Sequence, residues 1–189
     1  MSVVNQQERL SVQEAKKWYL AGCIEGEGSL CVSMKTMPAS RFGYLVDPEF
    51  FLYQHYSGIK MLHLAKEIFG TGSIRPKVGN EDVLVYSIAS RKSLYERVIP
   101  FYENYMCFSA KWEIFLRFKE IVVAMEERKE HLTPHGLVKL VKKAYEMNPA
   151  SKGKERKRPL QEVIDGILRG HTPDTSKAIV SSDDMVRSQ

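Results

Sequence analysis

Residues 18–29 read Trp-Tyr-Leu-Ala-Gly-Cys-Ile-Glu-Gly-Glu-Gly-Ser, and this stretch decides the fold. Its first half belongs to a helix, because Ser11 is a favourable N-cap residue and Glu14, three residues later, completes a capping box. Gly28 is a stop signal at the other end, since glycine is common just past the last helical turn. We therefore predict a helix between Ser11 and Gly28.

The end of this helix has an unusual composition. Gly22 and Gly26 stand four residues apart on one face, where each should cost about 1 kcal/mol relative to alanine. That cost is reasonable where another backbone must approach closely. Glu25 and Glu27 crowd the negative end of the helix dipole and repel each other, and a divalent cation would relieve both penalties. The stretch predicts a close helix–helix contact with a metal at its foot.

The composition fits one globular domain with a nucleic-acid partner. The chain has 189 residues, of which 43% are hydrophobic, enough for one core. No apolar run approaches the roughly 20 residues that span a bilayer, so no membrane partner is expected. Three scattered cysteines argue against a disulfide framework or zinc site. The net charge is +5 and the pI is about 9.0, which suits a polyanion. Residues 139–158 hold eight basic and two acidic residues.

Hydrophobic periodicity predicts the remaining elements. Strands are expected at 29–35 and 46–55, followed by a helix capped by Ser57 that ends near Phe69, and by a hairpin of residues 74–78 and 83–89. A helical stretch from Ser90 to about Tyr105 should be interrupted at Pro100. Later helices are expected at 112–128, 133–147 and 159–168, with a disordered tail at 171–189. The order is α+β, αββαββα, with a four-stranded antiparallel sheet that carries helices on one face and exposes the other.

The nonamer at residues 20–28 resembles the signature of the LAGLIDADG homing endonucleases, with glutamate at both acidic positions. Downstream segments are similar to single-motif members encoded in ribosomal RNA introns: Ser29, residues 47–50 leading to Gln54, residues 69–72 and residues 99–101. The resemblance covers roughly residues 10–170, taken as one endonuclease domain (1–170). No second copy of the signature is found. The resemblance therefore implies a homodimer, with Ala21, Gly22, Glu25 and Gly26 in the interface, and a saddle-shaped sheet on double-stranded DNA.

The resemblance also implies the chemistry. Glu27 and the carbonyl of Gly26 would bind Mg²⁺, for which Mn²⁺ or Ca²⁺ can substitute in binding, and Gln54 would order the attacking water. Both strands would be hydrolysed to leave short 3′ overhangs. The plainer interpretations are that Glu27 only ends a helix in solvent and that Gln54 contacts a phosphate. We interpret Glu25 as structural, and His55 stays open as a proton acceptor.

One family branch places basic residues where this chain has Gly58 and Tyr105, and either Lys60 or Lys111 could substitute. The residues expected to contact DNA share a strand parity or a basic loop. They are Ser33, Lys35, Glu49, Phe51, Tyr53, Arg75 and Lys77 on the strands, and Lys152, Lys154, Arg156, Lys157 and Arg158 in the loop.

Two other functions stay open for the same fold: an intron maturase that binds intron RNA, and a non-catalytic nucleic-acid-binding protein. The intact acidic nonamer favours the nuclease, because a pure binder has little reason to hold both acids. The expected compartment is an organelle, chloroplast or mitochondrion, or the bacterial cytoplasm.

Overall fold

The computed structural model describes residues 11–147 and 158–170. The predicted first helix is α1 (Val12–Glu27). The Ser11 hydroxyl accepts a hydrogen bond from the Glu14 N–H at 3.1 Å, and Gly28 follows the helix in an extended conformation. The Glu14 carboxylate, however, accepts from Lys17 and from the Tyr105 hydroxyl, so only one half of the predicted capping box is used for capping.

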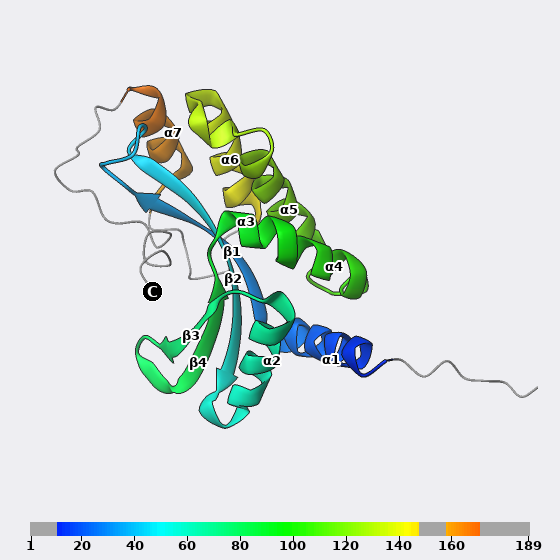
Figure 1. Cartoon of the computed structure of the whole chain (residues 1–189). Helices are drawn as coiled ribbons and strands as arrows, with labels where there is room; N and C mark the ends of the chain where they lie inside the picture. The colour runs from blue at the N-terminus through cyan, green and yellow to red at the C-terminus, as the bar shows by residue number, and fades with distance from the viewer. Residues whose placement is uncertain (1–10, 148–157, 171–189) are drawn as a thin grey trace, which may run out of the picture.

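Four antiparallel strands form one sheet in the order β1-β2-β4-β3 (Figure 1). Their bounds are β1 (Gly28–Thr36), β2 (Tyr44–His55), β3 (Ser73–Lys77) and β4 (Asn80–Ile88). Strand β2 is central, since its Phe50 is opposite Leu30 on one side and Ile88 on the other. The predicted α+β architecture is confirmed.

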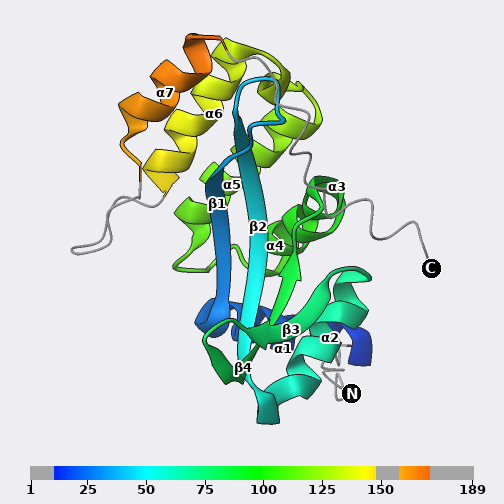
Figure 2. The ribbon, with the colours of Figure 1, turned by 90° about the vertical axis from the view of Figure 1, so that its left-hand side faces the viewer.

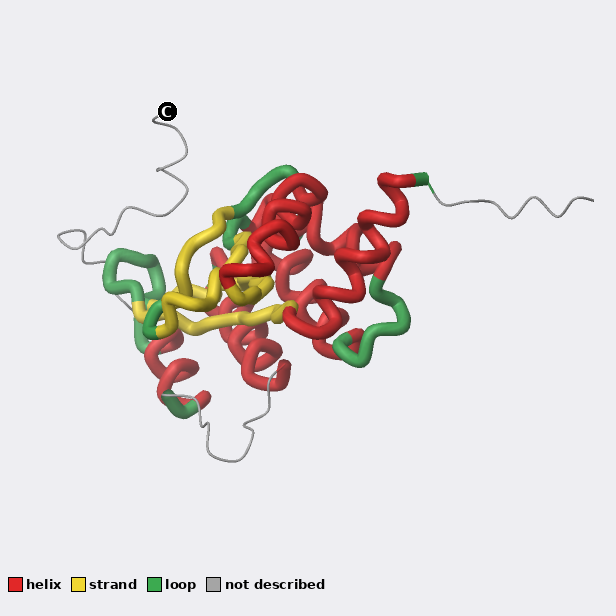
Figure 3. The backbone as a smooth tube through the Cα atoms, turned by 90° about the horizontal axis from the view of Figure 1, so that it is seen from below, coloured by secondary structure: helices red, strands yellow, loops and turns green. Residues whose placement is uncertain are grey.

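Helices cover one face of the sheet, and the tube view separates the strands from most of them (Figure 3). Their bounds are α2 (Ile59–Phe69), α3 (Arg91–Ser93), α4 (Ile99–Tyr105), α5 (Trp112–Glu126), α6 (Pro134–Met147) and α7 (Leu160–Leu168). Alternate strand residues point into this layer: Leu30, Val32, Phe50, Leu52 and Tyr86 are almost fully buried. Burying one side chain of this size stabilises the fold by about 1.5–3 kcal/mol.

Two local predictions need correction or refinement. Ser57 does not cap α2; a 3₁₀ turn (Tyr56–Gly58) comes first, and the His55 imidazole accepts from the Ser57 N–H at 3.3 Å. The interruption at Pro100 takes the form of a π-helical stretch at Leu94–Val98, immediately before it. Proline has no N–H to offer the carbonyl four residues earlier, so the backbone widens there instead of continuing as an α-helix.

Some predicted features lie outside the described residues: Lys152, Lys154, Arg156 and Lys157 of the basic loop, and the tail at 171–189. Arg158 is described and half-buried. Within residues 11–147 and 158–170, none of the helices combines the length and apolar character needed to cross a bilayer.

Candidate active site and nucleic-acid interface

Glu27 occupies the last position of α1, with its side chain exposed. Its carboxylate makes no hydrogen bond or ion pair to any residue that the structure describes. Tyr19 and Cys23 precede it at intervals of four residues and therefore share its side of the helix. Burial raises the pKa of the Cys23 thiol, and the nearby negative charge of Glu27 adds to this effect. The carboxylate is thus positioned by the helix end and available to an external ligand.

Gln54 lies beside this helix end. Gly28 is opposite Leu52 in the sheet, so the strand brings Gln54 alongside the last turn of α1. The hollow that contains Gln54 is lined by Tyr19, Cys23, Gly58, Lys60, Met61 and Leu64. A Cβ atom at Gly58 would lie 2.7 Å from the Gln54 side-chain oxygen. The absence of a side chain at position 58 therefore leaves room for the Gln54 amide.

Lys111 and Lys60, the two alternative basic residues, have different surroundings. The Lys111 ammonium donates to the carbonyls of Ile24 and Gly28, at 3.1 and 2.7 Å. It thus supplies positive charge at the negative C-terminal end of the α1 dipole, in addition to the hydrogen bond that the Ile24 carbonyl accepts from the Gly28 N–H. Lys60 is exposed on α2 and lines the Gln54 hollow. Spacing alone could not distinguish these surroundings.

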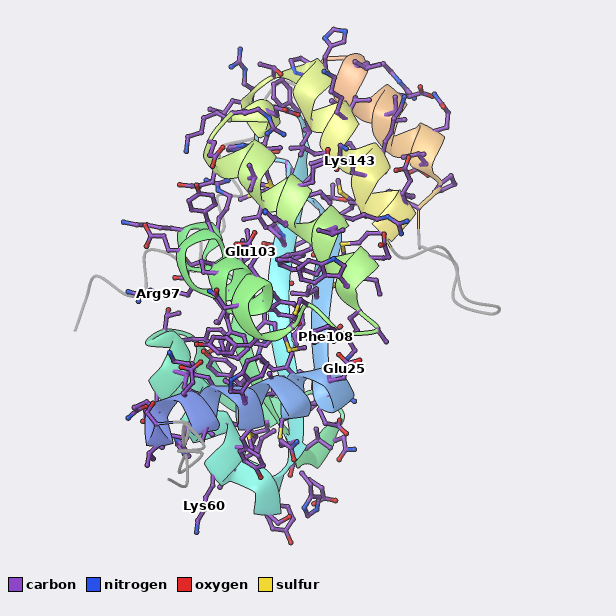
Figure 4. The ribbon with its side chains drawn as sticks, turned by 90° about the vertical axis from the view of Figure 1, so that its right-hand side faces the viewer. Glu25, Lys60, Arg97, Glu103, Phe108 and Lys143 are labelled. Atoms are coloured by element: carbon purple, nitrogen blue, oxygen red, sulfur yellow. The ribbon has the colours of Figure 1, made fainter. Side chains whose placement is uncertain are left out.

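Glu25 contacts the loop between α4 and α5. Its carboxylate accepts from the Ser109 hydroxyl and from the Ala110 N–H, the latter at 3.1 Å. The partners are more than 80 residues away, so no sequence pattern could have identified them. Figure 4 shows Glu25 at the end of α1, close to this loop. The acid is engaged inside its own protomer, in keeping with the structural interpretation.

The outer face of α1 is open. A Cβ atom added to Gly22 or to Gly26 would meet nothing within 4 Å. Ala21 is 5% exposed and packs within its own protomer. The two glycines therefore form a smooth strip on the helix surface that does not serve packing inside one copy of the chain.

One protomer offers few metal ligands. The described residues contain no group of three His, Cys, Asp or Glu side chains able to hold a metal ion. Glu27 and the backbone carbonyl of Gly26 provide hard oxygen donors at one helix end. Mg²⁺ keeps several waters and takes only one or two carboxylates plus substrate phosphates, so this donor set fits it.

His55, the open candidate for a proton acceptor, is engaged locally. Its ring nitrogen caps the 3₁₀ turn at Ser57, and its ring lies 4.2 Å from that of Tyr56. No contact brings it to Glu27.

The uncovered face of the sheet carries the strand residues expected to contact DNA, and Figure 2 looks onto it. Neighbouring positions meet across it: the Lys77 ammonium lies 5.6 Å from the Tyr53 ring centroid, and the Phe51 and Tyr53 rings are 6.0 Å apart. Ser33 donates to the carbonyl of Asp47 at 3.4 Å. Side chains of this face thus offer donors, acceptors and flat rings on a single surface.

Charges of both signs are interleaved on this face. Lys35 pairs with Asp47. Burial, reinforced by Asp47, raises the pKa of the Glu49 carboxyl, while Lys35 and Arg75 oppose the rise. Such a surface is suited to hydrogen-bonding base edges as well as phosphates.

Comparison with known proteins assigns this geometry to a family. The sequence profile described as LAGLIDADG endonuclease matches residues 20–122. DNA endonuclease I-CeuI of Chlamydomonas moewusii is 50% identical over 99 residues, which are 52% of this chain and 45% of that protein. Homing endonuclease I-ApeII of Aeropyrum pernix is 31% identical over 147 residues, 77% of this chain and 86% of that one. The chain thus spans less than half of the first relative and most of the second.

Solved structures agree. The intron-encoded homing endonuclease I-CeuI in complex with DNA superposes with a TM-score of 0.75 and 36% identity, over 85% of this chain and 79% of that chain. The archaeal intron-encoded homing endonuclease I-Vdi141I in complex with DNA gives 0.75 and 34%, over 83% and 97%. With the nonamer at the end of α1 and the open four-stranded sheet, these matches show that the chain belongs to the LAGLIDADG endonuclease family.

Proposed function

We propose that two copies of this chain form a site-specific homing endonuclease that hydrolyses both strands of a long, nearly palindromic DNA site. The cut would leave short 3′ overhangs and start intron homing. The observation that carries the proposal is the Glu27 carboxylate, which is exposed and has no partner among residues 11–147 and 158–170, at the end of a helix whose outer face carries Gly22 and Gly26. Pairing two such helices would bring two carboxylates together, and a twofold protein matches a palindromic site.

Each residue near the helix end has a task in this reaction. Glu27 and the Gly26 carbonyl would hold a divalent cation, Mg²⁺ in the first place, with Mn²⁺ or Ca²⁺ able to replace it in binding. When bound, such a cation activates water and stabilises charge on the phosphate. The Gln54 amide can both donate to and accept from the attacking water, which orients its oxygen toward phosphorus. The Lys60 ammonium, in the same hollow, can pair with a phosphate oxygen.

The open sheet face would read the site. Phe51, Tyr53, Glu49 and Arg75 would contact base edges or sugars there, and the basic loop that includes Arg158 would grip the flanking backbone. Base contacts specify sequence, while phosphate contacts set affinity and its dependence on salt.

The test is to incubate the purified protein with Mg²⁺ and an intronless ribosomal RNA gene and to map the cut ends. Glu27→Gln should keep DNA binding within about twofold and lower the cleavage rate by about 1000-fold, because the amide loses the charge that binds the cation. Glu67→Gln is the control: this exposed acid pairs with Lys16 at 2.9 Å and should not matter. Wild-type rates in Glu27→Gln would refute the proposal.

The same experiment addresses the maturase alternative. Filter binding of the protein to its own intron transcript would reveal specific RNA affinity. Specific RNA binding without any DNA cleavage would replace the nuclease with a maturase of the same fold.

A further inference from the structure

Phe108 is an exposed aromatic residue on a fixed loop. It lies between α4 and α5 with 95% of its surface accessible. The same loop is tied to the end of α1, because Ser109 and Ala110 bind Glu25 and Lys111 binds the carbonyls of Ile24 and Gly28. An aromatic side chain held out into solvent by such contacts is typical of an interaction site.

The exposed face of α1 has two different flanks. At about 100° per residue, Gly22 and Gly26 lie at the centre of this face. On one flank, Trp18 and Glu25 adjoin the Phe108 loop, and together they line an open groove. On the other, Tyr19 and Cys23 adjoin α2 across the Gln54 hollow. Figure 4 shows α1 between the two, with Phe108 on one side and Lys60 of α2 on the other.

Twofold symmetry determines which flanks meet. This step rests on the proposed function, which requires both Glu27 carboxylates at one place. Two antiparallel copies of α1 would put them at opposite ends of helices that are about 24 Å long, so the helices must run parallel. The twofold axis then lies between the two helices and runs parallel to them. Rotation about that axis brings the Phe108 flank of one copy against the Tyr19 flank of the other.

We propose that Phe108 of each copy packs against the exposed Tyr19 ring at the rim of the hollow in the second copy. Two such contacts then flank the glycine strip and leave Gln54 and Lys60 open to water and phosphate. Rotation about an axis parallel to α1 does not change the position of a residue along the helix, so the two contacting surfaces must lie at the same position along α1. The Phe108 groove spans Trp18 to Glu25, and the hollow spans Tyr19 to Cys23 and reaches Gln54. Both surfaces are rich in apolar atoms, and Tyr19 is itself 64% exposed. Glu25 acts as a positioning residue, since it fixes the loop that presents Phe108.

A charge-swap experiment tests this contact. Phe108→Asp and Tyr19→Lys are made in separate, differently tagged chains without DNA, and dimerisation is measured by sedimentation and native mass spectrometry. Each variant alone should raise the dimer dissociation constant by about 100-fold, tenfold for each of its two altered contacts. Mixing them should restore a heterodimer to within about tenfold of the wild-type affinity, because one contact is native and the other pairs Asp with Lys.

Both positions are exposed, so the folded protomers should be retained, which thermal unfolding verifies. Leu132→Asp, at an exposed leucine on a remote 3₁₀ turn, is the control and should dimerise normally. Wild-type dimerisation by either variant, or no preference for the mixed pair, overturns this contact while leaving a cleaving wild-type dimer intact. A wild-type protein that neither dimerises nor cleaves contradicts the proposed function itself.

Discussion

At the residue scale, a single lysine supplies positive charge to the C-terminal end of α1. Lys111 is half-buried, and its two hydrogen bonds reach the carbonyls of Ile24 and Gly28 on either side of Glu27. From the sequence alone, a divalent cation is expected to relieve the electrostatic penalty of Glu25 and Glu27 at this helix end. The structure shows that part of it is already offset by a cation of the same chain.

Removing this cation should destabilise the fold. Lys111→Met deletes two charge-assisted hydrogen bonds, and we expect the free energy of unfolding to fall by about 1.5–3 kcal/mol in urea denaturation. Lys60→Met removes an exposed lysine and should change stability by less than about 0.5 kcal/mol. Equal effects of the two variants would contradict the capping role of Lys111.

A second residue gives the fold a pH dependence. The ring Nε2 of His131 lies 3.2 Å from Arg91 Nη1, while its Nδ1 is buried without a partner among the described residues. Burial, and then Arg91 and Lys129, lower the pKa of His131 below 6.5. The unfolded chain therefore binds the proton more readily than the native one. Above about pH 6.5 this histidine is neutral in both states and does not reduce the free energy of unfolding. As the pH falls below that value, the unfolded chain takes up the proton first and the free energy of unfolding decreases.

We therefore expect the free energy of unfolding to depend less steeply on pH when His131 is replaced. Between about pH 7.5 and pH 5, His131→Gln should show a smaller loss of unfolding free energy than the wild type. His135→Gln, at an exposed histidine on α6, should behave as the wild type does. Parallel pH profiles for wild type and His131→Gln would show that His131 does not contribute.

At the element scale, α1 uses glycine for two distinct reasons. Gly22 and Gly26 have open space where a Cβ would stand, whereas a Cβ at Gly28 would lie 2.6 Å from the Ile24 carbonyl oxygen. Gly22 and Gly26 keep the outer surface of the helix free of side chains, whereas Gly28 allows close packing inside one protomer. The helix needs neither Gly22 nor Gly26 for its own stability, since alanine is the better helix former.

Alanine substitutions separate the two reasons. Gly22→Ala should stabilise the dilute protomer by up to about 1 kcal/mol in thermal unfolding, yet weaken dimerisation by tenfold or more, because the added methyl groups push the paired helices apart. Gly28→Ala should instead destabilise the protomer by about 1–3 kcal/mol through backbone overlap. If Gly22→Ala sediments as the wild type does, the glycine strip is not part of the dimer interface.

At the scale of the whole molecule, the sheet divides the work between its faces. One face anchors the core. The other face, which none of the described helices covers (Figure 2), carries interleaved charges and rings. The net charge of +5 favours DNA in general, whereas in the proposed function the acidic and aromatic groups of the open face would discriminate between sites.

Salt titrations distinguish the two kinds of contact. If Lys77 contacts a phosphate, Lys77→Ala should reduce the slope of log K against log salt by about 1 for each subunit, without changing site preference. Glu49→Gln should leave the slope nearly unchanged and alter the preferred base at one position in each half-site. A change of slope for Glu49→Gln with unaltered preference would exclude it as a base reader.

The sequence by itself determined the local elements and the family. Alternation of Leu30 and Val32 with polar residues set the faces of β1, and Ser11 and Gly28 marked the ends of α1, because caps and periodicity act over a few residues. The nonamer singled out Glu27 in the same way. These signals involve residues that are close together in the sequence, so they can be read without the tertiary structure.

Only the tertiary structure decided how distant groups complete the site. Glu25 finds Ser109 at a separation of 84 residues, Lys111 reaches the end of α1, and Gly58 makes room for Gln54. No side chain caps α2, because the chain turns through a 3₁₀ segment before this helix and His55 caps that segment instead. Such contacts depend on the angles at which helices pack on a twisted sheet, and no residue spacing encodes those angles.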